Sequence, residues 1–157
     1  MATHPASDEQ LVTKNRRALF DYHITQRFEA GLVLAGSEVK SVRAGKVDVA
    51  DAYVAIERGE AWLRQMFVAP FESAHAFPHE PRRPRKLLLR GREIAELERA
   101  LGREGRTAVP LRLYFKRGRV KVEVAVGTGK KTHDKRADIA KRDAEREARA
   151  AIRARNR

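Results

Sequence analysis

Alternation of apolar and polar side chains over residues 22–34 limits what this chain can fold into more than any other feature of the sequence. The even positions of this stretch are mostly apolar: Tyr22, Ile24, Gln26, Phe28, Ala30, Leu32 and Leu34. The odd positions include charged residues, Arg27 and Glu29 among them. A period of two sustained over this length predicts a long β-strand with one buried face. Gly31 interrupts the strand and permits the sharp bend that a small barrel needs at a corner.

Two further segments have the pattern of β-hairpins. Residues 52–68 contain two runs rich in aromatic and β-branched residues on either side of the dipeptide Arg58-Gly59. Residues 107–127 contain two alternating apolar runs on either side of Gly118. Glycine at the centre of such a segment favours the tight turn that joins two antiparallel strands. The sequence therefore predicts antiparallel pairing in both places.

Helices are predicted between the strands. Ser37 can cap a short helix that Gly45 would end. Residues 69–85 hold four of the six prolines and predict a loop. A longer helix within residues 86–105 has apolar residues on one face: Ile94, Leu97 and Leu101.

Five or six antiparallel strands of this kind remove their exposed edges by closing. We therefore expect a mainly β fold: a small closed barrel of the oligonucleotide-binding (OB) type with two or three helices and a basic C-terminal tail. The expected organisation is a disordered leader at residues 1–14, the barrel at residues 15–129 and the tail at residues 130–157.

The tail has a composition of its own. Residues 130–157 carry eleven Lys or Arg and five Asp or Glu, a net charge of +6, and their only large apolar residues are Ile139 and Ile152. Two isoleucines cannot form a core-facing stripe, yet Ala, Arg, Lys and Glu are strong helix formers. The segment is therefore expected to be coil or helix when free and helical in an anionic groove. A solubilising tail without a partner is the alternative.

The whole chain has a net charge of +13 and a pI near 10.7, which favours a polyanionic partner. An acidic membrane surface would require a basic helix with large apolar residues on one face, and no segment has that pattern. There is no cysteine, no signal-peptide pattern and no apolar run long enough to span a bilayer. A cytoplasmic protein is expected.

Motifs for catalysis or cofactor binding are incomplete. The stretch "GTGKKTHDKR" at residues 127–136 resembles a phosphate-binding loop, but Val124 and Lys131 stand where that loop needs Gly and Ser or Thr. His75 and His79 have a metal-compatible spacing without a third ligand. No enzyme activity, cofactor or metal is therefore expected.

Three aromatic residues in the first hairpin could form a stacking platform for bases, although strand aromatics more often lie in the core. We interpret them as core residues: Tyr53, Trp62 and Phe67.

Four motifs carry a family resemblance: "EAGLVLAGSEVKSVRAGKV", "RKLLL", "PLRLYF" and "GKKTHDKR". They resemble the SsrA-binding protein family, SmpB, from about Asn15 to the C-terminus. The resemblance implies an OB-fold protein that is monomeric and not an enzyme, and that binds the tRNA-like domain of transfer-messenger RNA (tmRNA). With GTP-bound elongation factor Tu, such a protein delivers tmRNA to stalled 70S ribosomes for nascent-chain tagging.

The resemblance also implies the site residues. On the barrel, the tmRNA-binding positions are Arg16, Arg17, Tyr22, Glu29, Lys40, Arg43, Lys86, Leu88 and Arg90. In the tail, the positions for the decoding centre and mRNA channel are Gly129, Lys130, Lys131, His133, Asp134, Lys135, Arg136, Lys141 and Arg142.

Particular roles follow for some of these residues. His133 would stack on a base and Asp134 would orient the neighbouring cations. Gly127 and Gly129 would form a flexible joint between barrel and tail.

Some positions depart from the family pattern. Many members have Asn at the position of Arg90, and polar residues at the positions of Leu19 and Phe20. A structural ribosomal protein or a general RNA-binding protein remains the alternative function.

Overall fold

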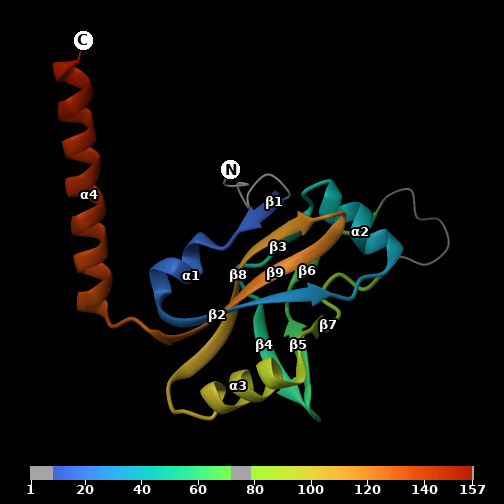
Figure 1. Cartoon of the computed structure of the whole chain (residues 1–157). Helices are drawn as coiled ribbons and strands as arrows, with labels where there is room; N and C mark the ends of the chain where they lie inside the picture. Colours follow the sequence, from blue (N-terminus) through green and yellow to red (C-terminus); the bar gives the residue numbers. More distant parts are fainter. Residues whose placement is uncertain (1–8, 72–78, 157) are drawn as a thin grey trace, which may run out of the picture.

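The computed structural model describes residues 9–71 and 79–156 (Figure 1). These residues form nine strands: β1 (Glu9–Lys14), β2 (Tyr22–Leu32), β3 (Val47–Asp48), β4 (Tyr53–Glu57), β5 (Glu60–Arg64), β6 (Phe67–Val68), β7 (Arg85–Leu88), β8 (Arg106–Lys116) and β9 (Arg119–Gly129). They also form four helices: α1 (Arg16–Asp21), α2 (Gly36–Arg43), α3 (Gly91–Leu101) and α4 (Thr132–Arg155). The fold is mainly β, as expected.

Seven strands form one antiparallel sheet in the order β1-β8-β9-β2-β7-β5-β4, and β3 pairs with β6 separately. Both predicted hairpins are confirmed: β4 pairs with β5, and β8 pairs with β9. Their two-residue turns are Arg58-Gly59 and Arg117-Gly118, and all four residues have positive φ. Such turns match the right-handed twist of the strands that they join.

The alternation in β2 places Phe28, Ala30 and Leu32 in the core, while Arg27 and Glu29 are exposed. The pairing of β2 with β9 shifts between Ile24 and Gln26. This irregularity leaves Gln26 exposed although it is an even position.

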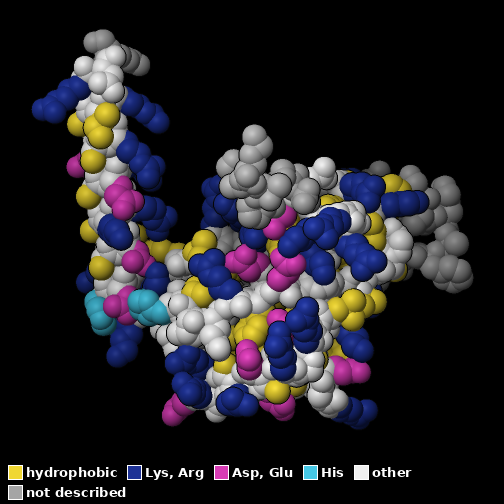
Figure 2. Space-filling view, in the orientation of Figure 1, with side chains coloured by type: hydrophobic (Ala, Val, Ile, Leu, Met, Phe, Trp, Pro, Cys, Tyr) yellow, Lys and Arg dark blue, Asp and Glu magenta, His cyan; other side chains and the backbone are white. Residues whose placement is uncertain are grey.

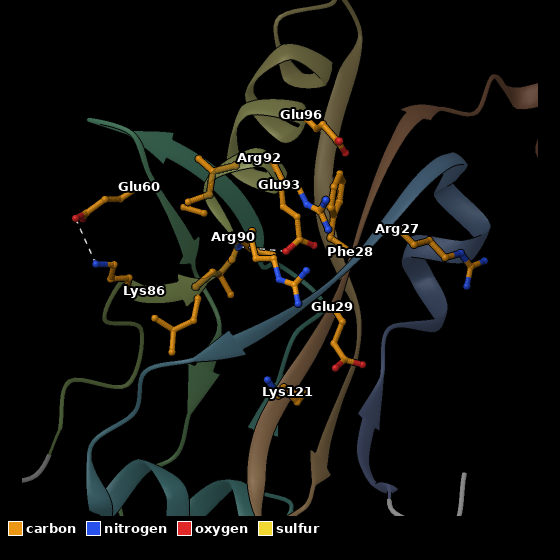
Figure 3. Close-up of a pocket in the computed structure, with 15 residues that line it drawn as sticks. Arg27, Phe28, Glu29, Glu60, Lys86, Arg90, Arg92, Glu93, Glu96 and Lys121 are labelled. Atoms are coloured by element: carbon orange, nitrogen blue, oxygen red, sulfur yellow. Dashed lines mark hydrogen bonds and ion pairs between the residues drawn. The ribbon is translucent and has the colours of Figure 1, made fainter. Parts of the chain in front are cut away.

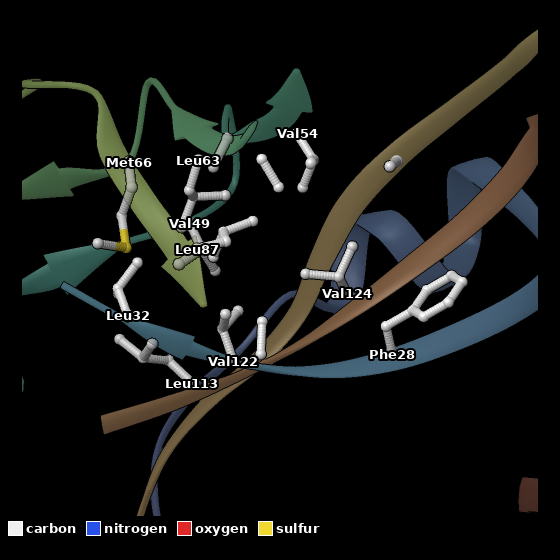
Figure 4. Packing of buried hydrophobic residues seen from close by; sticks show 14 of the residues in the cluster. Phe28, Leu32, Val49, Val54, Leu63, Met66, Leu87, Leu113, Val122 and Val124 are labelled. Atoms are coloured by element: carbon white, nitrogen blue, oxygen red, sulfur yellow. The ribbon is translucent and has the colours of Figure 1, made fainter. Parts of the chain in front are cut away.

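The inner side chains of the large sheet meet in one buried hydrophobic cluster, which forms the core (Figure 4). Leu63, Leu87 and Leu113 come from three different strands, and each is at most 1% exposed. Burying a leucine contributes about 1.5–3 kcal/mol, so these long-range contacts hold the strand order.

The predicted barrel of the OB type was expected to be closed, and this part of the prediction is wrong. Among the described residues, the hydrogen-bonded ladder has two ends, β1 and β4, and no pairing joins them. β4 instead lies against β8 without main-chain pairing.

The predicted disordered leader is wrong for residues 9–14. This segment is β1, an edge strand that pairs antiparallel with β8. The ion pair between Arg112 Nη1 and Glu9 Oε2, at 2.9 Å, supplements the ladder. Residues 1–8 of the predicted leader lie outside the described residues.

Helix α1 was not predicted. Asn15 is buried and caps this helix, because its Oδ1 accepts a hydrogen bond from the Ala18 backbone N–H at 3.1 Å. Its Nδ2 donates to the Pro110 carbonyl of β8 at 2.9 Å.

The short helix predicted after β2 is α2, but Ser37 is not its cap. The cap is Ala35, whose backbone N–H donates to the Glu38 carboxylate at 2.9 Å. The carboxylate three residues into the helix thus replaces the hydroxyl that the sequence suggested.

The interpretation of three hairpin aromatics as core residues is also wrong. Tyr53 is exposed, and Trp62 and Phe67 are only half-buried. Phe67 belongs to β6, and the Arg82 guanidinium lies 5.6 Å from its ring centroid. Aromatic composition therefore identified strands here but did not identify the buried face.

Candidate nucleic-acid interface

A groove of about 870 Å³ runs along β2, β7 and the start of α3 (Figure 3). It brings together four of the residues predicted for the barrel interface: Glu29, Lys86, Leu88 and Arg90. Three further basic residues line the same groove and were not predicted: Arg27, Arg92 and Lys121. Arg27 and Lys121 occupy odd positions of β2 and β9, and Arg92 lies in the first turn of α3. The strand alternation and the start of the helix were the available signals.

Close pairing of β2 with β7 forms the floor of the groove. Gly31 pairs with Leu88, and a Cβ atom at Gly31 would lie 3.2 Å from the Leu88 Cβ. The missing side chain makes room for Leu88 beside Gly31. The alternation of β7, in which Arg85 and Leu87 are buried, turns Leu88 outward. Leu88 is 55% exposed, which is unusual for a leucine at the centre of a sheet. A nucleobase or ribose face is a suitable partner for it.

The rim of the groove is set by the start of α3. The Arg90 backbone N–H donates to the Glu93 carboxylate at 3.1 Å, which begins the helix at this point. Arg90 is the residue before the first turn and lines the groove. It places a cation at the rim of the groove.

Glu29 is held by the sheet rather than free in the groove. The Tyr114 hydroxyl donates to Glu29 Oε2 at 2.6 Å, and Lys116 Nζ lies 3.3 Å from Oε1. The Tyr114 hydrogen bond is the main cause that lowers the pKa of Glu29. Burial and the neighbouring carboxylate raise the pKa of Tyr114. The groove therefore presents an ionised carboxylate in a fixed orientation, able to accept from a base or a ribose 2′-OH.

Helix α2 carries Lys40 and Arg43, but neither lines the groove. Lys40 Nζ lies 5.4 Å from the Phe71 ring centroid, and the Arg43 guanidinium lies 5.3 Å from that of Phe115. The structure thus places both predicted residues on aromatic rings outside the groove.

A buried ion pair between Glu38 of α2 and Arg85 of β7 holds α2 against the sheet. Glu38 and Arg85 are fully buried and hydrogen-bonded to each other, and Arg83 also bonds Glu38. The Arg85 guanidinium further donates to the Met66 carbonyl at 2.7 Å. Several hydrogen bonds compensate the cost of burying these charges.

The remaining barrel predictions, Arg16, Arg17 and Tyr22, lie near the root of the tail. Arg16 lines a cleft of about 480 Å³ between α1 and α4 together with three predicted tail residues: Lys130, Lys141 and Arg142. Arg17 pairs with Asp21 at 3.4 Å. Tyr22 is half-buried and its backbone pairs with Gly129.

The proposed flexible joint at Gly127 and Gly129 is wrong, because both glycines belong to β9 and pair with β2. A Cβ atom on Gly127 would lie 2.7 Å from the His23 carbonyl oxygen. Gly127 is therefore required for close approach of two strands, not for bending.

The tail beyond these glycines forms α4, which projects from the body with basic side chains along it (Figures 1 and 2). Its first turns are anchored to α1 and β2. The Lys130 backbone N–H donates to the Asp21 carbonyl at 2.7 Å, and Lys135 Nζ lies 3.1 Å from Asp21 Oδ1. His23 Nε2 and Asp134 Oδ2 are 3.2 Å apart, and this contact is the main cause that lowers the pKa of Asp134.

Phe20 also contacts the first turns of α4. Lys135 Nζ and the Arg142 guanidinium each lie 5.5 Å from its ring centroid. A polar residue could not offer this cation–π contact.

The other tail residues are open to a partner. Lys131, His133 and Arg136 are accessible, and the His133 side chain is 76% exposed. The Asp134 carboxylate accepts a hydrogen bond from the Lys131 backbone N–H at 3.3 Å, which caps the first turn of α4. That Asp134 orients the neighbouring cations stays a prediction. Ile139 and Ile152 are both exposed, so the far part of α4 presents its apolar side chains to solvent.

Groups that could hold a metal ion were sought among the described residues. No cluster of three or more His, Cys, Asp or Glu side chains occurs there. His79 bonds Ser37 Oγ and the Val68 carbonyl, each at 3.0 Å, and His75 lies outside the described residues. No helix in the described part of the chain is long and apolar enough to cross a membrane.

The groove is lined by five basic and four acidic side chains, and a strongly basic helix projects from the same body. Together with the net charge of +13, these features define a polyanion-binding protein, and nucleic acids are the usual partners of such surfaces. The family model described as "SmpB protein" matches residues 12–154. The chain therefore belongs to the SmpB family.

Individual relatives agree with this assignment. The SsrA-binding protein of Carboxydothermus hydrogenoformans is 49% identical over 147 residues, which are 94% of this chain and 99% of the relative. That of Desulforudis audaxviator is 53% identical over 152 residues, which are 96% of this chain and 97% of the relative. A chain of a solved structure described as "tmRNA-SmpB: a journey to the center of the bacterial ribosome" is 44% identical, with a TM-score of 0.65. It covers 76% of this chain, and the match spans 85% of that chain.

Proposed function

We propose that this protein binds tmRNA and acts in trans-translation, the rescue of stalled ribosomes by nascent-chain tagging. The single observation that carries the proposal is that the chain matches SsrA-binding proteins at 49% and 53% identity over nearly its full length. The groove is consistent with it, because four residues that the family resemblance implies in tmRNA binding line one surface.

The groove has the chemistry for a folded RNA. Arg90 and Arg92 can meet backbone phosphates, while Leu88 offers an apolar face to an unpaired base. Glu29 accepts a hydrogen bond from a base or a ribose hydroxyl of the RNA and does not contact the phosphates. On this basis we assign to residues 15–129 the binding of the tRNA-like domain of tmRNA.

The tail has the chemistry for a different RNA environment. Residues 130–157 carry a net charge of +6 and α4 extends away from the body. A long cationic helix fits a narrow channel walled by phosphates. We assign the tail to the decoding centre and the mRNA channel of the stalled ribosome, where His133 stacks on a base.

The wider assembly follows from this role. Elongation factor Tu with GTP is the expected partner in delivery, a monomer is the expected state, and the cytoplasm is the expected location. No catalytic step is assigned to the protein, and no cofactor or metal enters the proposed function.

Recovery of RNA from a bacterial lysate tests the function. The tagged full chain should enrich tmRNA well above other RNAs when the bound RNA is sequenced. Leu88→Ala should reduce that enrichment, whereas Leu11→Ala removes an equally exposed leucine from β1 and should not. Recovery of bulk ribosomal RNA without tmRNA would contradict the proposal and favour a structural ribosomal protein.

A further inference from the structure

A smaller pocket, with three arginines and one glutamate in its lining, continues the groove along α3 and β2. It has a volume of about 330 Å³ and is lined by three arginines: Arg99, Arg103 and Arg106. Glu96 lines both the groove and this pocket. The β2 residues that line them are consecutive, with Thr25 and Gln26 in the pocket and residues 27–29 in the groove.

The three arginines are placed together by different elements. Arg99 lies in the last turn of α3 and Arg103 in the turn that follows, where the negative end of the helix dipole favours cations. Arg106 begins β8. Its Nη1 donates to Thr25 Oγ1 at 2.9 Å, and Thr25 Oγ1 donates to the Val126 carbonyl at 3.1 Å. Arg106 is therefore held against β2 with most of its five N–H donors still available.

The local charge is not balanced within the protein. Arg27, Arg85 and Arg112 each pair with a carboxylate. Within residues 9–71 and 79–156, no carboxylate lies within ion-pair distance of Arg99, Arg103 or Arg106. Three guanidinium groups face one carboxylate, that of Glu96, so the pocket carries a net charge of +2.

We infer that this three-arginine pocket binds a backbone phosphate of the same tmRNA that occupies the groove. The inference rests on the proposed function and extends its interface. Guanidinium groups bind phosphate oxygens through paired N–H donors, and two or three of them can surround one phosphate.

Continuity of the surface selects tmRNA over ribosomal RNA as the source of the phosphate. From Thr25 to Phe28 the strand advances roughly 10 Å, at about 3.3 Å per residue, which is a distance that a few nucleotides can span. An RNA strand that contacts Leu88 and Arg27 can therefore reach Arg106 without leaving the surface. The sheet supplies Arg106 as a fixed donor, and α3 supplies Arg99 from the opposite wall.

The test measures binding of isolated tmRNA across a salt series. Arg99→Ala/Arg103→Ala removes two exposed cations and leaves the Arg106–Thr25 hydrogen bond intact. Arg153→Ala/Arg155→Ala is the matched control, because it removes the same charge from the exposed far end of α4. Arg99→Lys/Arg103→Lys keeps the charge without the paired donors. Thermal unfolding of each variant checks that all three remain folded.

The alanine pair should weaken tmRNA binding about tenfold, as the removal of charge-assisted hydrogen bonds implies. It should also reduce the slope of log affinity against log salt by about 0.7–0.9 for each phosphate that the protein no longer neutralises. The lysine pair should keep most of that slope, and the α4 control should bind as the unchanged protein does.

Equal binding and an equal slope for the alanine pair and the α4 control would overturn the inference. Loss of ribosome engagement with unchanged tmRNA binding would also overturn it, because the phosphate would then come from ribosomal RNA. If the unchanged protein failed to bind tmRNA, the proposed function itself would be wrong.

Discussion

Replacing Glu29 or its partner Tyr114 separates the structural role of the groove carboxylate from its role in RNA binding. Tyr114 is 1% exposed, so Glu29→Ala leaves its buried hydroxyl without the acceptor at 2.6 Å. An unpaired buried donor costs about 1–3 kcal/mol, and the free energy of unfolding should fall by that amount. Glu29→Gln keeps a neutral acceptor, whereas Tyr114→Phe keeps the carboxylate and removes the hydroxyl.

Glu29→Ala and Tyr114→Phe should differ in RNA affinity. Glu29→Ala removes a negative charge beside a polyanion, and charge alone would strengthen binding. A specific acceptor contact outweighs that effect, so binding of isolated tmRNA should weaken by about 1–3 kcal/mol. Tyr114→Phe should lose about 1 kcal/mol of stability but keep most of the affinity, because the carboxylate remains ionised and paired with Lys116.

Urea denaturation and equilibrium binding measure the two quantities on the same samples. Tighter binding by Glu29→Ala would remove Glu29 from the interface. Equal loss of affinity in Glu29→Ala and Tyr114→Phe would show that the carboxylate acts only through the sheet.

The lowered pKa of Glu29 gives this pair a pH signature. Its ordinary pKa is 4.5, and the stabilisation is present above that value and is lost as the pH falls through the lowered pKa of the folded state. Because the Tyr114 hydrogen bond is the main cause of the shift, Tyr114→Phe should remove most of this pH dependence. Unfolding measured from about pH 7 down to about pH 3 should therefore show a shallower acid limb for Tyr114→Phe than for the unchanged protein.

Three further predictions follow from the packing and from the tail. Glu38→Ala leaves the buried Arg85 without its carboxylate partner, so the free energy of unfolding measured in urea should fall by about 3–5 kcal/mol. A decrease below about 1 kcal/mol would show that the ion pair is not needed for stability. Gly127→Ala places a Cβ atom 2.7 Å from a carbonyl oxygen of β2 and should lower the free energy of unfolding by about 1–3 kcal/mol. Gly129→Ala meets no atom within 4 Å, so its free energy of unfolding should stay within about 0.5 kcal/mol of the unchanged protein. Equal unfolding midpoints for the two variants would contradict the packing argument. His133→Ala should weaken ribosome binding by about 1–3 kcal/mol without changing its salt dependence, and His133→Phe should restore most of the affinity if the ring stacks; an equally defective His133→Phe would exclude stacking.

Local patterns predicted the strands and their turns well, because the alternation and the turn glycines act over a few residues. Val120, Val122 and Val124 are buried as their alternation indicates. Closure of the sheet was not predictable, because it depends on whether β4 and β1 meet through main-chain groups after the sheet has twisted. β1 was missed for a related reason: its pairing partner β8 lies about a hundred residues away, and its own pattern is short.

The sequence motifs brought several residues of the candidate site to attention, but not the tertiary contacts that hold them. Glu29, Lys86 and Leu88 were expected at the interface and line one groove. The Tyr114 hydroxyl that holds Glu29 comes from a strand 85 residues away, and no local signal indicates it. The anchoring of α4 by Asp21 likewise depends on three-dimensional proximity, although the helical tendency of the tail was readable from its composition.

The central claim is that the body binds tmRNA and that the tail acts on the ribosome, and one truncation tests both parts. A chain that ends at Gly129 keeps all nine strands of the described fold and removes a charge of +6. Its dissociation constant for isolated tmRNA and its tagging of a stalled nascent chain are measured beside those of the full chain. Near-equal tmRNA binding with loss of tagging is the predicted result. Loss of tmRNA binding by a truncated chain that still unfolds cooperatively, or full tagging without residues 130–157, would contradict the account.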